Sequence, residues 1–156
     1  MKRFMFFVSL IIFTLSTVSS AQTIDFNVKG IGIGTSYQTA LRQFGKPLSN
    51  RKSGTNPCGG TKQTLRYSGL TITLDEGEDR QNIIVLIEVT SPKWEVASGI
   101  GVGASLKDMR AKFGQSGELS KELGFNVLTY FDGDGTANFY FRNKKLVKVN
   151  RDLNLC

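Results

Sequence analysis

The stretch IGIGTSYQTALRQFG (31–45) decides the fold, because the chain repeats it in altered form as IGVGASLKDMRAKFG (100–114). The second copy begins 69 residues after the first, and six of the fifteen aligned positions are identical. Each copy ends in Phe-Gly and is followed by a run of strand-like segments. The sequence therefore predicts two tandem units, each with one helix and several strands.

Each copy has the pattern of a short amphipathic helix. Ser36 and Ser105 stand at the N-cap positions, and Asp108 completes a capping box with Ser105. Apolar residues then recur at helical spacing in each copy. Gly45 and Gly114 mark the helix ends. Helices of about nine residues are not stable alone in water, so we expect both to pack against a sheet.

Strand-like segments follow both helices. LTITLD (70–75) alternates apolar and polar residues, as a half-buried antiparallel strand does. NIIVLIEVT (82–90) is rich in β-branched residues and predicts a more buried strand. Further strands are expected at 63–68, 125–131, 136–142 and 145–150, and 23–28 is either a strand or an extended lead-in. Short turns between strands require antiparallel neighbours.

The expected fold class is α+β, with two tandem units whose sheets lie side by side. Each unit is a short helix packed on an antiparallel β-meander, at 22–98 and 99–156, and together they form one compact domain. Two stretches lack a strand pattern. Residues 49–62 are expected to be the longest loop, and 115–124 a polar connection that can hold a helical turn. Long irregular loops are usually functional or disordered.

Residues 1–21 have the features of a secretory signal peptide. Lys2 and Arg3 precede an apolar run, and Ser19-Ser20-Ala21 supplies small residues before the expected cleavage point. The apolar run is short for a membrane span, and no later stretch reaches transmembrane length. We therefore expect a secreted protein, periplasmic or extracellular. Without Lys2 and Arg3 the formal charge falls from +7 to +5, which favours solubility over a dedicated electrostatic function.

The two cysteines, Cys58 and Cys156, both lie in the part expected to be exported, where oxidation is favoured. A single disulfide between them is the leading interpretation. In the chain-entropy model, closing a loop of this length contributes about 4–5 kcal/mol to stability. The alternatives are two free thiols or pairing with another chain.

The residue types leave little room for catalysis. The chain has no histidine, which excludes Ser-His-Asp and Cys-His chemistry and the usual zinc sites. The glycine series 30–34 and 99–103 match neither a dinucleotide fingerprint nor a P-loop and predict structural turns. Asp132, Asp134, Thr136 and Asn138 have calcium-loop spacing, but Asn143 stands where the twelfth-position acid belongs, so we expect a hairpin turn. We expect no enzyme, no cofactor and no metal.

Basic and aromatic residues gather in the last strands, a mixture that can bind nucleic acid. Phe139 and Phe141 share one face with Ala137 and are expected in the core, which leaves Tyr140 pointing outward. A solvated sheet face is the better interpretation, and export argues further against nucleic acid.

The repeated phrase Ile-x-Ile/Val-Gly-x-Ser…Phe-Gly, followed by a meander, resembles the repeat of the beta-lactamase-inhibitor-protein-like proteins. It is also similar to the SmpA/OmlA-type small outer-membrane lipoproteins, although no lipid-attachment cysteine is present. The resemblance covers 29–151 and implies a helix packed on a small antiparallel sheet, occurring twice. It carries over the fold and no functional residue.

These observations predict a non-enzymatic module that binds or inhibits a protein in the cell envelope or exterior. The alternative is a structural or assembly component of the envelope. The residues expected to bind the partner are Arg51, Lys52, Asn56, Trp94 and Tyr140. For Trp94, the sole tryptophan, two interpretations stay open: an interface residue, or a plug over the junction between the units.

Overall fold

The computed structural model describes residues 26–55, 60–76, 82–96, 99–132 and 135–153. It is an α+β fold of mostly strands, with two short helices. The elements in chain order are α1 (Tyr37–Phe44), β1 (Ser49–Thr55), β2 (Thr61–Tyr67), β3 (Leu70–Glu76), β4 (Asn82–Val89), β5 (Glu95–Val96), β6 (Ile100–Gly101), α2 (Leu106–Phe113), β7 (Glu118–Glu122), β8 (Phe125–Asp132), β9 (Gly135–Arg142) and β10 (Lys145–Leu153).

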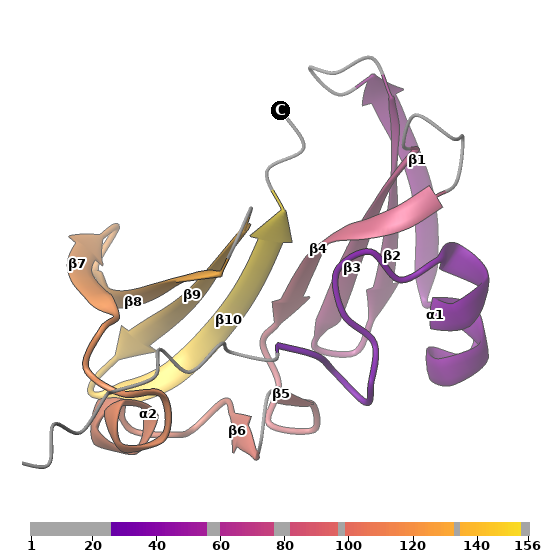
Figure 1. Ribbon diagram of the computed structural model, residues 1–156. Helices are drawn as coiled ribbons and strands as arrows, with labels where there is room; N and C mark the ends of the chain where they lie inside the picture. Colours follow the sequence, from indigo (N-terminus) through magenta and orange to yellow (C-terminus); the bar gives the residue numbers. More distant parts are fainter. Residues whose placement is uncertain (1–25, 56–59, 77–81, 97–98, 133–134, 154–156) are drawn as a thin grey trace, which may run out of the picture.

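Eight of the strands form one antiparallel sheet, in the order β1-β2-β3-β4-β10-β9-β8-β7 (Figure 1). The first four strands of the chain occupy one half of the sheet, and the last four occupy the other in mirrored order. β4 and β10 join the halves, with Val89 opposite Val149 and Ile87 opposite Arg151. The two expected meanders are therefore continuous in a single sheet, and β5 pairs with β6 apart from it.

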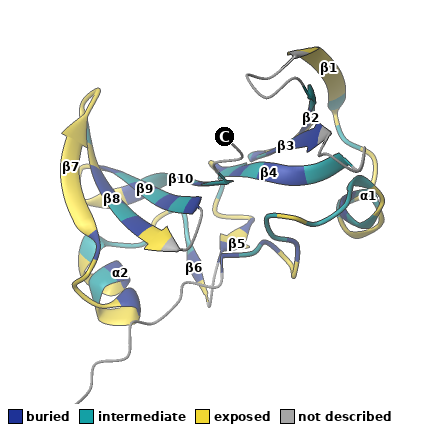
Figure 2. Cartoon of the chain, turned by 45° about the horizontal axis from the view of Figure 1, so that its top comes forward, coloured by how far each residue is buried: buried dark blue, intermediate teal, exposed yellow. Residues whose placement is uncertain are grey.

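The hydrophobic core lies on one face of this sheet. A row of directly opposed residues crosses six strands on that face: Leu65, Ile72, Ile87, Arg151, Ala137 and Tyr130. All six are buried, and the buried helix residues Ala40, Met109 and Phe113 belong to the same core cluster. Both helices therefore cover the same face, as Figures 1 and 2 show.

The helix ends follow the predicted capping chemistry. The Ser36 hydroxyl accepts a hydrogen bond from the Thr39 amide at 3.4 Å, and Ser105 with Asp108 forms a complete capping box. The Ser105 hydroxyl donates to the Asp108 carboxylate at 2.7 Å. This bond, helped by the Ser105 amide, holds the pKa of Asp108 below its usual range. Both predicted N-caps are confirmed.

The two helices are fastened to the sheet by equivalent hydrogen bonds. The Gly34 amide donates to the Ile84 carbonyl at 2.8 Å, and the Gly103 amide donates to the Leu146 carbonyl at 2.8 Å. At the far end of each helix, a tyrosine hydroxyl from the sheet donates to the carbonyl of the terminal glycine. These bonds run from Tyr67 to Gly45 at 3.1 Å and from Tyr130 to Gly114 at 3.0 Å.

The two stretches expected to be irregular contain strands, so those expectations are wrong for most of their length. Ser49–Thr55 pairs with β2 and Glu118–Glu122 pairs with β8. Both are edge strands with largely exposed side chains, so neither has a buried face to impose alternation on the sequence. Their strand geometry comes from backbone pairing with an inner neighbour, which polar composition does not reveal.

Trp94 lies in the helix-side core and is only 5% exposed. Its indole Nε1 donates to the Ser68 carbonyl at 2.8 Å, and its ring meets that of Phe44 edge-on at 5.7 Å. A buried indole offers little surface to a partner, and both of these contacts lie within the first expected unit, so they do not place Trp94 over the junction between the units. The residues of the predicted disulfide, Cys58 and Cys156, lie outside the described residues. So do the predicted signal peptide at 1–21 and the predicted binding residue Asn56.

Two glycines with similar φ angles test how closely Ser91 packs against the turn at Gly69. Gly69 has φ +74°, and a Cβ there would lie 2.2 Å from the Ser91 Cβ; Gly30 has φ +79° and open space around it. We expect Gly30→Ala to lower the free energy of unfolding by about 1–2 kcal/mol through backbone strain alone. Gly69→Ala should cost about 1–3 kcal/mol more because it adds overpacking. Urea unfolding measures both, and equal losses would contradict the close approach of Ser91.

Candidate functional site

The face of the sheet opposite the helices, called here the open face, is mainly polar, with a few apolar residues such as Leu86, Val127 and Phe131. One row of directly opposed residues crosses all eight strands: Ser49, Arg66, Thr71, Glu88, Asn150, Asn138, Thr129 and Glu118. A second row crosses seven: Arg51, Thr64, Thr73, Leu86, Asp152, Thr136 and Phe131. Neither helix of the described chain covers this face (Figure 2).

The alternation of the inner strands creates this face. In β9, burial alternates along the whole strand, with Ala137, Phe139 and Phe141 buried on the helix side. The residues between them, Asn138 and Tyr140, are half-buried on the open face. This confirms the predicted orientation of Tyr140 and of the two phenylalanines. The polar face follows directly from the period of two in a strand.

Hydrogen bonds and one ion pair order the middle of the open face. The Thr129 hydroxyl donates to Asn138 Oδ1 at 2.7 Å, and Lys148 Nζ lies 3.6 Å from Glu88 Oε2. Asn150 Oδ1, on the central strand β10, is buried and has no hydrogen-bond partner among the described residues. Burying an acceptor without a partner costs about 1–3 kcal/mol.

An aromatic–cation cluster occupies one end of the open face and consists of Phe125, Tyr140, Arg142 and Lys148. Lys148 Nζ lies 3.9 Å from the centroid of the Tyr140 ring. The Arg142 guanidinium carbon lies 4.4 Å from the Phe125 centroid, and the two rings meet edge-on at 5.9 Å. Each aromatic ring is therefore held between another ring and a cation, which fixes its orientation.

The structure does not bring the predicted binding residues together. Arg51 lies on the open face in β1, at one edge of the sheet, and Tyr140 lies five strands away in β9. Lys52, the next residue after Arg51, points to the helix side, and Trp94 is buried. Sequence reasoning missed Phe125, Lys148 and the central polar rows. The alternation within each strand could have predicted which face these side chains occupy. Only the register between β4 and β10 shows that they form one surface.

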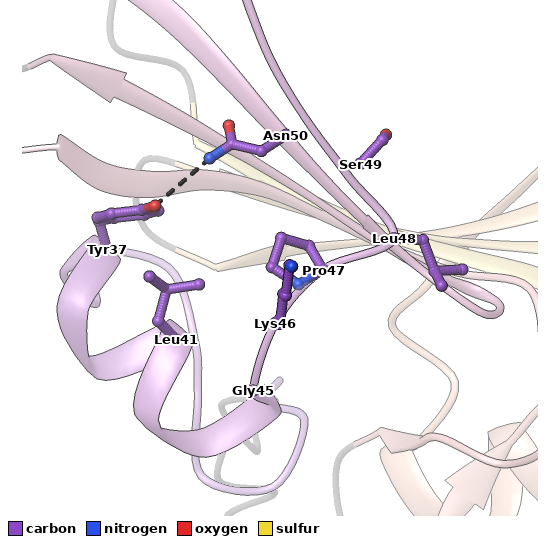
Figure 3. A pocket seen from close by; sticks show the side chains of 8 residues that line it. All are labelled: Tyr37, Leu41, Gly45, Lys46, Pro47, Leu48, Ser49 and Asn50. Carbon is purple, nitrogen blue, oxygen red and sulfur yellow. Dashed lines mark hydrogen bonds between the residues drawn. The ribbon is translucent and has the colours of Figure 1, made fainter.

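A groove lies on the helix side of the sheet, between α1 and β1 (Figure 3). This groove has a volume of about 570 Å³ and is lined by Tyr37, Leu41, Gly45, Lys46, Pro47, Leu48, Ser49 and Asn50. The Asn50 amide donates to the Tyr37 hydroxyl at 3.4 Å across it and accepts from Gln63 at 2.8 Å. Leu48 is 78% exposed at its rim.

Within the described ranges, no three acidic, cysteine or histidine residues gather closely enough to hold a metal ion. No helix in those ranges has the length and apolar character needed to cross a membrane.

Solved structures share this fold. The chain matches an extracellular protein containing an SCP domain from Bacillus anthracis, with 14% identity, a TM-score of 0.53, and coverage of 94% of this chain and 50% of that one. It matches a cysteine-rich secretory protein from Staphylococcus aureus with 14% identity, a TM-score of 0.50, and coverage of 78% and 44%. The chain thus spans about half the length of these proteins, and the likeness shows the fold alone.

A proposed beta-lactamase inhibitor protein from Streptococcus mutans also aligns, with 20% identity over 78% of this chain and 85% of that one, at a TM-score of 0.32. An overlap this low carries no argument about the chain. No protein-family model matches the sequence. The comparison with curated proteins gives no match either.

The two faces of β9 give a test of which side is free. Phe139 is fully buried, and its neighbour Tyr140 is half-buried on the open face. We expect Phe139→Ala to lower the free energy of unfolding by about 3–5 kcal/mol and Tyr140→Ala to lower it by less than about 1 kcal/mol. Chemical denaturation measures both variants. A large loss for Tyr140→Ala would mean that this ring supports the fold and is not free for a partner.

Proposed function

We propose that this chain is an exported, non-enzymatic module that binds a protein partner through the open face. The observation that carries the proposal is the polar row from Ser49 to Glu118, which crosses all eight strands without a covering helix. A sheet needs only one apolar face to form a core. A second, ordered polar face of this width supports a role in recognition.

The chemistry of the open face suits a protein surface. Tyrosine and arginine are enriched among the residues that dominate binding energy, and Tyr140 and Arg142 stand together in the aromatic–cation cluster. The cluster rests on strand backbone, so little conformational entropy is lost when a partner binds. A partner enzyme whose active site met this face would be inhibited by occlusion.

Export is part of the same proposal. The first residues have the composition of a signal peptide, and both cysteines lie beyond them, where a disulfide would form in an oxidising compartment. The two solved structures of similar fold are titled as an extracellular and a secretory protein. These features support a location in the periplasm or outside the cell.

We also infer that 22–98 and 99–156 are two copies of one unit. Three observations support this: the repeated sequence at 31–45 and 100–114, the mirrored strand order, and the equivalent bonds that fasten each helix. Joined at β4 and β10, two copies make a sheet twice as wide as either would alone. The open face is thus a product of the duplication.

Site-directed photocrosslinking tests the proposed surface. A photoreactive amino acid replaces Thr71 or Thr129 on the open face, and Lys112, exposed on α2, serves as the matched helix-side control. The protein is irradiated in the envelope fraction and culture fluid of the producing cells. We expect one protein to crosslink from both open-face positions and not from Lys112, because only the open face contacts the partner. Mass spectrometry identifies the adduct.

Tyr140→Ala supplies the energetic control, and the affinity of the identified partner should fall about tenfold or more, as for a central aromatic contact. Crosslinks from Lys112 alone, or none from any position, would contradict binding through the open face. Adducts to many membrane components would instead indicate a structural role in the envelope.

A further inference from the structure

The outer edge of β1 is a strand edge with a groove beside it. Among the described residues β1 pairs only with β2, so no described strand pairs with the backbone groups on its other side, and another chain can add there (Figure 1). Residues 50–54 are exposed. The groove between α1 and β1 opens directly beside this edge (Figure 3). An extended segment laid along β1 would therefore pass over the groove.

The groove has an apolar wall and polar groups above it. Leu41, Pro47 and the Tyr37 ring form the apolar part, and the linked side chains of Tyr37 and Asn50 form the polar part. Every second side chain of a strand added at this edge would point toward the helix side. One of these would enter the groove, so the site favours an apolar residue at that position.

The charge around this edge has one sign. The described residues 26–55 carry no acidic side chain and five basic ones: Lys29, Arg42, Lys46, Arg51 and Lys52. All five are exposed, and no described carboxylate forms an ion pair with Arg51 or Lys52; the ion pair identified in the described ranges joins Lys148 and Glu88. The opposite edge, β7, has mixed charge, with Glu118, Lys121 and Glu122.

We propose that the edge of β1 and the adjoining groove bind an extended acidic segment of a partner protein as an added strand. Backbone pairing with β1 supplies the register, an apolar side chain fills the groove against Leu41 and Pro47, and carboxylates meet Arg51 on one face and Lys52 on the other. A second copy of this chain is disfavoured at this edge, since pairing β1 with β1 brings like charges together.

This site meets the open face only at Arg51, and its test is independent of the partner proposed for that face. A display library of random peptides about eight residues long, a typical strand length, is selected on the full mature protein. It is counter-selected on Arg51→Glu/Lys52→Glu. We expect the enriched peptides to carry acidic residues on both faces of the strand and an apolar residue at the position that faces the groove. Titration of one such peptide should shift the backbone amide resonances of Ser49–Thr55 and those of Tyr37 and Leu41.

Three comparisons complete the test. The double charge reversal should weaken peptide affinity about tenfold or more, whereas Lys121→Glu on the β7 edge and Tyr140→Ala on the open face should leave it unchanged. A peptide with N-methylated backbone amides should not bind, because it cannot pair with β1. The amide spectrum of each variant confirms that it is folded.

Several results would overturn the proposal. One is a selection that enriches nothing, or that enriches peptides without acidic residues. The basic residues would then serve to prevent edge-to-edge association. Another is binding that maps to the open face or survives N-methylation. Concentration-dependent self-association that is lost with Arg51→Glu/Lys52→Glu would assign this edge to another copy of the chain.

Discussion

The antiparallel pairing of β4 with β10 is the constraint on which the rest of the structure depends. It sets Val89 against Val149 and Ile87 against Arg151, and so merges two meanders of four strands into one sheet. A meander of four strands with one helix of eight residues buries little apolar surface, and small cores are marginal. The joined sheet lets residues from both halves, such as Ala40 and Met109, enter one core cluster.

The same pairing explains why the two faces of the sheet differ. Both helices, the β5–β6 pair and Trp94 contribute to the core on one side, which leaves nothing in the described chain to cover the other. The polar residues of the strands then align into rows because the register continues through β4 and β10. The open face, with Lys148 and Tyr140 on the middle strands β10 and β9 and Arg51 on the edge strand β1, is thus the consequence of both helices covering the other side.

Much of this was predictable from local patterns. Ser36 and Ser105 were readable as N-caps, and the alternation around Phe139 and Tyr140 gave the correct faces, because capping and strand periodicity act within a few residues. β1 and β7 were missed because edge strands have no buried side to impose alternation. The candidate site was missed as a unit, since Glu88 and Asn150 become neighbours only through pairing of residues far apart in sequence. The burial of Trp94 likewise depends on Phe44 and Ser68, which are distant along the chain.

Hydroxyl-radical footprinting tests most directly the claim that one face forms the core and the other meets a partner. It measures the oxidation of aromatic side chains on both faces of the native protein. The protein is oxidised alone and then in the culture fluid and envelope fraction of the producing cells. Without these fractions, Phe131, which is 66% exposed, and Tyr140 should oxidise, and Phe139 and Phe141 should be protected. With them, oxidation of Tyr140 should fall. Equal oxidation of Phe139 and Tyr140, or no added protection of Tyr140, would contradict the account.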